Sequence, residues 1–326
     1  RGNKLFGDEI GAHFGWSVEL SDDGNTLAVA TPVGQSSYNG LIRVFEWDET
    51  EWNQIGDDIV GGYNDNLGYD IDLSADGRTL IASAPQIEDG LNWDFEPQEG
   101  VGYAIVYHYD SPWSWGEWEV VGCGAFTGDD DFISYREPRD VTISGDSRTI
   151  AIQEANVIRV YTWSDSVYGW VQIGGDIGFY GDACSLNHDG NILAVSDWSE
   201  SSGDARIFAY SESSNNWEQL GQDISDWNYN DWFGSDIDLS GEGDVLVIGR
   251  SSYSLDLEEN SGCYVYSWNG GSSTWELVTE YLTSYGTGRV VGAAKNGHSL
   301  IFGGEFINDS EGEALVLRNP AFAPDG

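Results

Sequence analysis

The sequence has no methionine, only three cysteines and seven prolines, and far fewer basic than acidic residues. Cys123, Cys184 and Cys263 cannot all pair with one another, and none lies in a CxxC or Cys/His metal spacing. This argues against a disulfide framework and favours small buried apolar residues. No window approaches the roughly 18 uninterrupted apolar residues of a membrane-spanning helix. Because position 1 is not methionine, we expect the chain to begin after a removed leader.

Basic residues are scarce: 13 Lys and Arg stand against 56 Asp and Glu, a formal net charge of −43. The acids are spread along the whole chain. Such a surface repels phosphates and anionic lipids, so we expect neither nucleic acid nor membrane insertion. Such a surface attracts cations, basic proteins or mineral surfaces. Alternatively, the charge serves only to keep the protein soluble in salty water, and composition does not decide between these two roles.

A strand–turn–strand unit repeats along the chain. Its clearest copy is residues 14–30, FGWSVELSDDGNTLAVA, which predicts two short strands around a tight turn. Related copies begin near Leu67, Arg136, Gly181, Phe233 and Tyr285. Glycines occupy turn positions that require a positive φ, at Gly24, Gly77, Gly190, Gly243 and Gly297. A third strand rich in aromatic and β-branched residues follows, as at 42–47 and 158–163. A fourth begins at a Trp, as at 52–59, 170–177 and 217–224.

Four strands per repeat predict an all-β fold, a six-bladed β-propeller of four-stranded blades, with seven blades as the alternative. We expect a single domain, 1–326, with blades near 11–61, 62–126, 127–179, 180–226, 227–282 and 283–326. The last repeat ends after its third strand, whereas Asn3–Ile10 matches the fourth-strand pattern ahead of the first repeat. We therefore expect the N-terminal strand, residues 1–10, to complete blade six and close the ring.

Residues 13–32, beginning His-Phe-Gly-Trp, resemble the FG-GAP repeat of integrin-α-like β-propellers, and Phe233-Gly234 begins a second good copy. Only two of the six units retain Phe-Gly. The resemblance implies an extracellular or cell-surface interaction module of the cell-adhesion type, with ligands on a loop face. Integrin-type propellers have seven blades and often hold calcium in a long loop. Here the corresponding turn, Ser21–Gly24, is too short to wrap calcium, so those sites are not carried over.

Length variation gathers on one set of loops, at 31–40, 85–100, 197–203, 250–262 and 305–312, and we expect this face to bind ligands. Eight tryptophans recur at fixed blade positions and are interpreted as packing. The candidate ligand-binding residues are the loop aromatics Trp93, Trp198, Trp227, Trp232, Tyr38, Tyr63 and Tyr229. They could stack on a glycan or anchor a protein, or pack over the loops themselves.

Carboxylates recur on the innermost strand of several repeats. The candidate metal ligands are Asp70, Asp72, Asp140, Asp236 and Asp238, directed at a central-channel cation for which calcium is the candidate. No cofactor is otherwise expected. The alternative is hydrogen bonding to the neighbouring backbone or to Arg136, Arg139 and Arg289.

No catalytic motif stands out: the four histidines are scattered, and no GxSxG or nucleotide-binding loop occurs. Abundant acids leave a glycosidase-like pair open. Arg43, Arg159 and Arg206 recur in the third strand and indicate a structural partner. Asn308 begins an N-glycosylation sequon. The main hypothesis is a secreted, non-catalytic module that binds a glycan or protein. The alternatives are an acidic cation- or mineral-associated structural protein and a propeller glycosidase or lyase.

Overall fold

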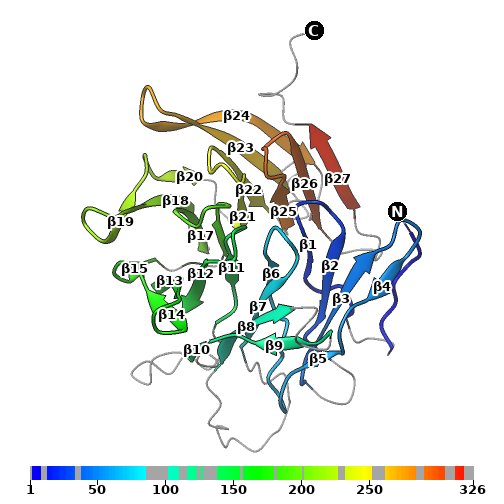
Figure 1. Ribbon diagram of the computed structural model, residues 1–326. Helices are drawn as coiled ribbons and strands as arrows, with labels where there is room; N and C mark the ends of the chain where they lie inside the picture. The colour runs from blue at the N-terminus through cyan, green and yellow to red at the C-terminus, as the bar shows by residue number, and fades with distance from the viewer. Residues whose placement is uncertain are drawn as a thin grey trace, which may run out of the picture. The chain divides into compact units, whose positions relative to one another are not determined.

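The computed structural model describes residues 2–8, 13–33, 38–85, 102–109, 116–122, 126–127, 138–154, 157–179, 181, 183–199, 202–226, 232–251, 261–283, 290–304 and 313–318. Every regular element in these ranges is a β-strand (Figure 1). No described helix is long and apolar enough for a bilayer crossing.

The strands form six sheets in chain order. The first holds β1 (Val18–Leu20), β2 (Thr26–Thr31), β3 (Leu41–Trp47), β4 (Trp52–Gln54) and β5 (Ile59–Val60). The second holds β6 (Ile71–Leu73), β7 (Thr79–Ala84), β8 (Tyr103–Tyr109), β9 (Trp118–Val120) and β10 (Phe126–Thr127). The third holds β11 (Val141–Ile143), β12 (Thr149–Glu154), β13 (Val157–Ser164), β14 (Gly169–Gln172) and β15 (Ile177–Gly178).

The fourth sheet holds β16 (Ala183–Leu186), β17 (Ile192–Ser199), β18 (Ser202–Ser211), β19 (Asn216–Gln219) and β20 (Ile224–Asp226). The fifth holds β21 (Phe233–Leu239), β22 (Val245–Arg250), β23 (Ser261–Asn269) and β24 (Thr274–Thr283). The sixth holds β25 (Val290–Ala293), β26 (Ser299–Gly304) and β27 (Glu313–Arg318).

Each sheet is an antiparallel meander with the strand order of a propeller blade. In the first four sheets the outer strand is split, so that two short strands, such as β4 and β5, pair with the same third strand. In the fifth sheet β24 is continuous and has a register shift opposite Val265 and Tyr266 instead. The split is therefore an irregularity within one fourth strand. The predicted six-bladed propeller of four-stranded blades is confirmed, and the seven-bladed alternative is wrong.

Neighbouring sheets bury apolar side chains against each other. Between the first two sheets, Ala28 and Ala30 of β2 lie in one cluster with Ile71 of β6 and Leu80 of β7, all at most 1% exposed. Small residues on one strand and large ones on the next let the two sheets approach closely. Each fully buried Ile or Leu contributes about 1.5–3 kcal/mol.

Tight turns join the first two strands of each blade, and within each unit they hydrogen-bond to the turn of the neighbouring blade. The N–H of Asp22 donates to the carbonyl of Ala75 at 3.0 Å, and that of Ala75 donates to Gly145 at 3.1 Å. Turn glycines such as Gly24 have a φ of 65°, as the sequence pattern requires. The short turns thus also join successive blades.

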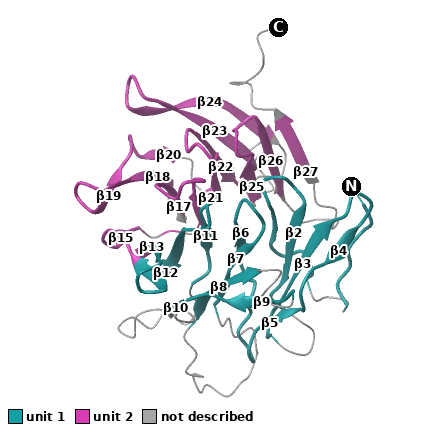
Figure 2. Cartoon of the chain, in the orientation of Figure 1, with its two compact units in different colours: residues 1–155, 161–171 teal, residues 156–160, 172–326 magenta. Residues whose placement is uncertain are grey.

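The chain divides into two compact units, which Figure 2 colours separately. Unit 1 comprises Arg1–Ala155 and Tyr161–Val171, and unit 2 comprises Asn156–Val160 and Gln172–Gly326. Each is described by itself below.

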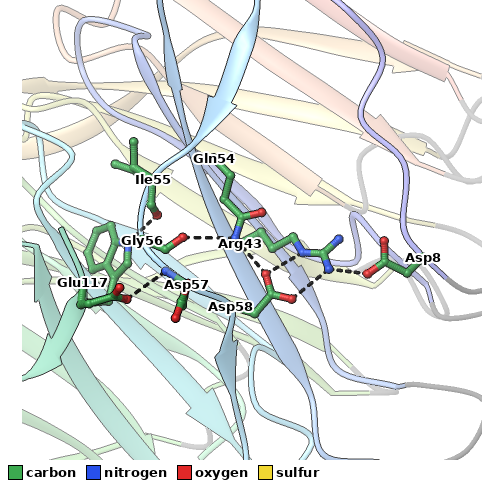
Figure 3. A network of polar contacts seen from close by, with 9 residues as sticks. Asp8, Arg43, Gln54, Ile55, Gly56, Asp57, Asp58 and Glu117 are labelled. Atoms are coloured by element: carbon green, nitrogen blue, oxygen red, sulfur yellow. Dashed lines mark hydrogen bonds and ion pairs between the residues drawn. The ribbon is translucent and has the colours of Figure 1, made fainter. Parts of the chain in front are cut away.

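A polar clamp holds the outer strand in three blades. In the first blade, the Arg43 guanidinium donates from Nε to Asp58 at 2.8 Å, and Gln54 donates to the same carboxylate at 2.8 Å (Figure 3). The Arg43 hydrogen bond lowers the pKa of Asp58. The third and fourth blades repeat the clamp with Arg159–Asp176 and Arg206–Asp223, both 3.1 Å. The structural role predicted for these three arginines is confirmed.

The N-terminal segment packs on the outer edge of the first blade. A side chain at Gly2 (φ 74°) would collide with Trp47, the Asn3 side chain accepts from the Trp52 N–H at 3.2 Å, and Asp8 pairs with Arg43. Residues 2–8 contain no strand. In unit 2, Gly221 and Gln222 contact Trp275 in the same way, with the Trp275 N–H donating to Gln222 at 3.0 Å.

These contacts change the register expected from the sequence. The fourth-strand pattern aligns Gly7 with Gly56, and Gly56 packs against Trp118 of the next blade. In the structure it is Gly2, not Gly7, that makes the equivalent contact, with Trp47 and Trp52. The reason is steric, because only a residue without a side chain fits against the indole edges. Pairing of this segment with blade six stays a prediction.

Candidate functional site

Carboxylates in or directly before the innermost strands link neighbouring blades. In unit 1, Asp70 accepts from the backbone N–H of Val141 at 2.9 Å. Asp72 accepts from the N–H of Ile143 at 2.7 Å and from the hydroxyl of Thr142 at 2.8 Å. These acids thus satisfy the inner edge of the next blade, which no strand covers.

Unit 2 repeats the arrangement. Asp236 accepts from the N–H of Val291 and Asp238 from the N–H of Ala293, both at 2.7 Å. Asp238 also accepts from the Ser185 hydroxyl at 2.7 Å. Its burial raises its pKa, against the opposing effect of these hydrogen bonds. The two aspartates of each pair therefore act as inter-blade contacts.

Four of the five candidate cation ligands, Asp70, Asp72, Asp236 and Asp238, thus accept hydrogen bonds from backbone N–H groups, which is the alternative that the sequence left open. Asp140 lies half-buried at the start of β11, where its carbonyl accepts from the Gln153 N–H at 3.1 Å. Across the described ranges, no group of three or more His, Cys, Asp or Glu side chains is placed to hold a metal ion.

An aromatic pair lies beside Asp70 in unit 1. The Trp16 indole N–H donates to the carbonyl of Tyr69 at 2.9 Å, and the two ring centroids are 5.6 Å apart. Trp16 is 45% exposed, and the ring of His13 lies 5.9 Å from it. The sequence holds Trp16 and Tyr69 directly before the first-strand positions of Ser17 and Asp70. Folding therefore places an exposed indole against Tyr69, the residue that directly precedes Asp70.

Hydrogen bonds fix the three strand starts that carry this group. The Ser17 hydroxyl lies 3.5 Å from Asp70 Oδ1, at the limit of a hydrogen bond. The Asp70 N–H donates to the Ser83 hydroxyl at 2.9 Å, and that hydroxyl donates to the carbonyl of Arg139 at 3.2 Å. Trp16, Ser17, Tyr69, Asp70, Arg139 and Asp140 are called the strand-entry site below. The strand-entry site thus combines an exposed indole and two half-buried aspartates with Arg139, which precedes the neighbouring innermost strand.

Tyr38 and Tyr63, two of the predicted ligand-binding residues, lie on a second part of unit 1. Tyr63 is 80% exposed, whereas the carbonyl of Tyr38 accepts from the Asn66 N–H at 2.7 Å. Beside them, Tyr103 donates to Asp65 at 2.6 Å. Burial, followed by this hydrogen bond, raises the pKa of Tyr103. The loop is built around a Tyr–Asp contact between residues 38 positions apart, which no spacing within one repeat indicates.

The other predicted aromatics belong to unit 2 or lie outside the described residues. Trp232 belongs to unit 2, where it is half-buried and has a φ of 42°. The Trp198 backbone lies in β17 opposite Gly203. Trp93, Trp227, Tyr229 and the sequon residue Asn308 lie outside the described residues.

The recurring tryptophans serve packing, as predicted. Trp217 and Trp275 are 6% and 3% exposed, and their indole N–H groups donate to the carbonyls of Ile173 and Leu220 at 3.1 and 3.0 Å. Both carbonyls belong to the preceding blade. Each Trp therefore fastens one blade to the one before it.

Comparison with known proteins supports the fold only. No protein-family model matches the chain, and no curated protein matches its sequence. A Bacteroides uniformis protein that carries 6-phosphogluconolactonase as a provisional name is similar, with a TM-score of 0.60 and 15% identity over 94% of this chain and 86% of that one. The periplasmic gluconolactonase of Pseudomonas aeruginosa gives 0.58 and 15% over 93% and 88%. Hydrazine synthase of Kuenenia stuttgartiensis gives 0.60 and 11% over 97% and 80%.

The main hypothesis of a non-catalytic binding module is contradicted by the names of these neighbours, which are enzyme names and agree better with the propeller-enzyme alternative. At 11–15% identity the likeness itself shows the fold alone. The FG-GAP assignment is not supported either, since no family model matches. The Phe-Gly pair has a packing role here: Phe233 is 2% exposed against Tyr264, and Gly234 has a φ of 86° close to Ser196. A dipeptide that blade packing requires says nothing about a ligand.

Proposed function

We propose that this chain is a propeller hydrolase that opens a small sugar lactone at the strand-entry site. The names of two structural neighbours, both lactonases, supply the reaction class. The observation that carries the proposal is the exposed Trp16 ring paired with Tyr69 beside the half-buried Asp70. An indole offers a flat apolar surface to the C–H face of a sugar ring.

Asp70 is the proposed general base. Its carboxylate takes a proton from a water molecule, whose oxygen attacks the lactone carbonyl carbon. The ring C–O bond then breaks, and the proton passes to the departing ring oxygen, giving the open hydroxy acid. Arg139, half-buried on the adjacent strand start, supplies positive charge for the oxyanion. One base is enough for this reaction, whereas a glycosidase needs two carboxylates at a set separation.

We also propose that the protein works outside the cell, as expected from the sequence. The net charge of −43 supports solubility in salty surroundings.

The test is hydrolysis of gluconolactone followed by acid release, with the spontaneous rate subtracted. Asp70→Asn should lower kcat by about 100-fold or more, the usual contribution of a general base. Trp16→Ala should raise KM about tenfold through lost stacking. The matched control is Asp236→Asn, because Asp236 makes the same contact to the next blade through Val291 at 2.7 Å, while Ser235 stands where Tyr69 precedes Asp70. Equal activity of Asp70→Asn and Asp236→Asn would refute the proposal.

A further inference from the structure

Outside the strand-entry site, the described arginines of unit 1 are paired with acids, and Lys4 belongs to the N-terminal segment on the outer edge of the first blade. In the described part of unit 1, Arg43 pairs with Asp58 and Asp8, Arg78 with Glu46, and Arg148 with Asp165. Arg43 and Arg78 also belong to elements away from the strand starts, β3 and the turn before β7. They cannot compensate additional negative charge on a substrate at the site.

The site itself is rich in acids. Asp70 and Asp140 stand at the starts of β6 and β11, Asp72 follows within β6, and Arg139 is the described cation among them. The chain as a whole has 43 more acids than bases. A phosphate monoester carries about −1.5 to −2 at neutral pH and would enter a field of its own sign.

We infer that the substrate is an uncharged sugar lactone and that the site discriminates against its phosphorylated counterpart. This inference rests on the proposed function. A neutral lactone enters the acidic surroundings without electrostatic cost, and ring opening converts it to a carboxylate, which the same field repels. Charge therefore favours entry of substrate and departure of product.

The test compares gluconolactone with freshly prepared 6-phosphogluconolactone on the intact chain, at low and at moderate salt. We expect kcat/KM to be at least tenfold higher for the neutral lactone. Salt should leave the neutral reaction unchanged and should raise kcat/KM for the phosphorylated one, because screening weakens repulsion.

The outcomes separate the two claims. Turnover of both lactones at similar rates, or faster turnover of the phosphorylated one, overturns the charge inference and leaves the proposed hydrolase standing. Turnover of neither overturns the proposed function and this inference with it. A neutral preference that persists without any salt dependence of the phosphorylated reaction also overturns it, because discrimination would then be steric.

Discussion

The carboxylate of Asp72 on β6 accepts from the backbone N–H of Ile143 on β11 at 2.7 Å, a contact between residues 71 positions apart. Its other oxygen accepts from the Leu73 N–H at 2.7 Å. Asp238 repeats both contacts in unit 2, with Ala293 and Leu239 at 2.7 and 2.8 Å. In each of these two blades one aspartate thus binds its own strand and the innermost strand of the next blade.

Replacing this carboxylate by its amide should destabilise the fold. In Asp72→Asn one oxygen becomes an NH₂ group, which must face either the Leu73 N–H or the Ile143 N–H. We expect a loss of about 1–3 kcal/mol in the free energy of unfolding, measured by urea titration. Thr142→Val removes only the hydroxyl donor and should cost about 1 kcal/mol. If Asp72→Asn were as stable as the wild type, the contact would have no energetic role.

The outer clamps predict how stability depends on pH. Hydrogen bonds from Arg43 and Arg159 lower the pKa values of Asp58 and Asp176, and Gln219 followed by Arg206 does the same for Asp223. The unfolded chain therefore takes up protons before the folded one. Stability from these groups should be complete above the ordinary aspartate pKa of about 4 and should be lost as the pH falls through the lower folded values.

Urea unfolding between pH 3 and pH 7 measures this effect. The triple variant Arg43→Gln, Arg159→Gln, Arg206→Gln should start slightly less stable at pH 7, because exposed ion pairs contribute at most about 1 kcal/mol each. It should also lose less stability on acidification. Parallel pH curves for the variant and the wild type would show that other carboxylates cause the acid sensitivity.

Much of the fold is predictable from the sequence because its signals are local. The turn glycines, the Trp at the start of each fourth strand and the Gln-x-Gly-x-Asp segments at 54–58, 172–176 and 219–223 each act within one blade or on its neighbour. A repeat of such signals determines the number of blades.

The strand-entry site was not predictable in the same way. Trp16 and Tyr69 are 53 positions apart and meet only when two blades pack, so no spacing within one repeat marks them. The variation in loop length predicted a binding site on a different set of loops. The Phe-Gly pairs suggested a family that the comparisons do not support. The same dipeptide is needed for packing, as at Phe233, and therefore matches the FG-GAP signature without sharing its function.

Two glycines of the third blade offer a matched test of the blade contacts. Gly174 has a φ of 72°, and a Cβ there would lie 2.7 Å from Trp217 Cδ1, whereas a Cβ at Gly178 meets nothing within 4 Å. Gly174→Ala should cost about 1–2 kcal/mol for the left-handed backbone, with a further cost from the clash. Gly178→Ala should be neutral or stabilising by up to about 1 kcal/mol. Thermal unfolding of the two variants compares them directly, and equal effects would contradict the packing role of Gly174.

The N-terminal segment should protect the outer edge of the first blade. Trp47 and Trp52 lie 5.4 Å apart, edge to face, and Gly2 and Asn3 lie against them. A chain that starts at Glu9 loses this cover together with the Asp8–Arg43 pair. We expect red-shifted tryptophan fluorescence, faster proteolysis near β4 and lower stability, because two aromatic rings become exposed to water.

The variant Asp8→Asn separates the packing from the ion pair. Asp8 is exposed, so removing its charge should change stability little and leave the fluorescence unchanged. Gly2→Val should reproduce part of the truncation, because its side chain would displace the segment from Trp47. If the truncated chain matches the full chain in fluorescence and proteolysis, the segment does not cover the Trp pair in solution. If Asp8→Asn alone reproduces the truncation, the ion pair and not the packing holds the segment.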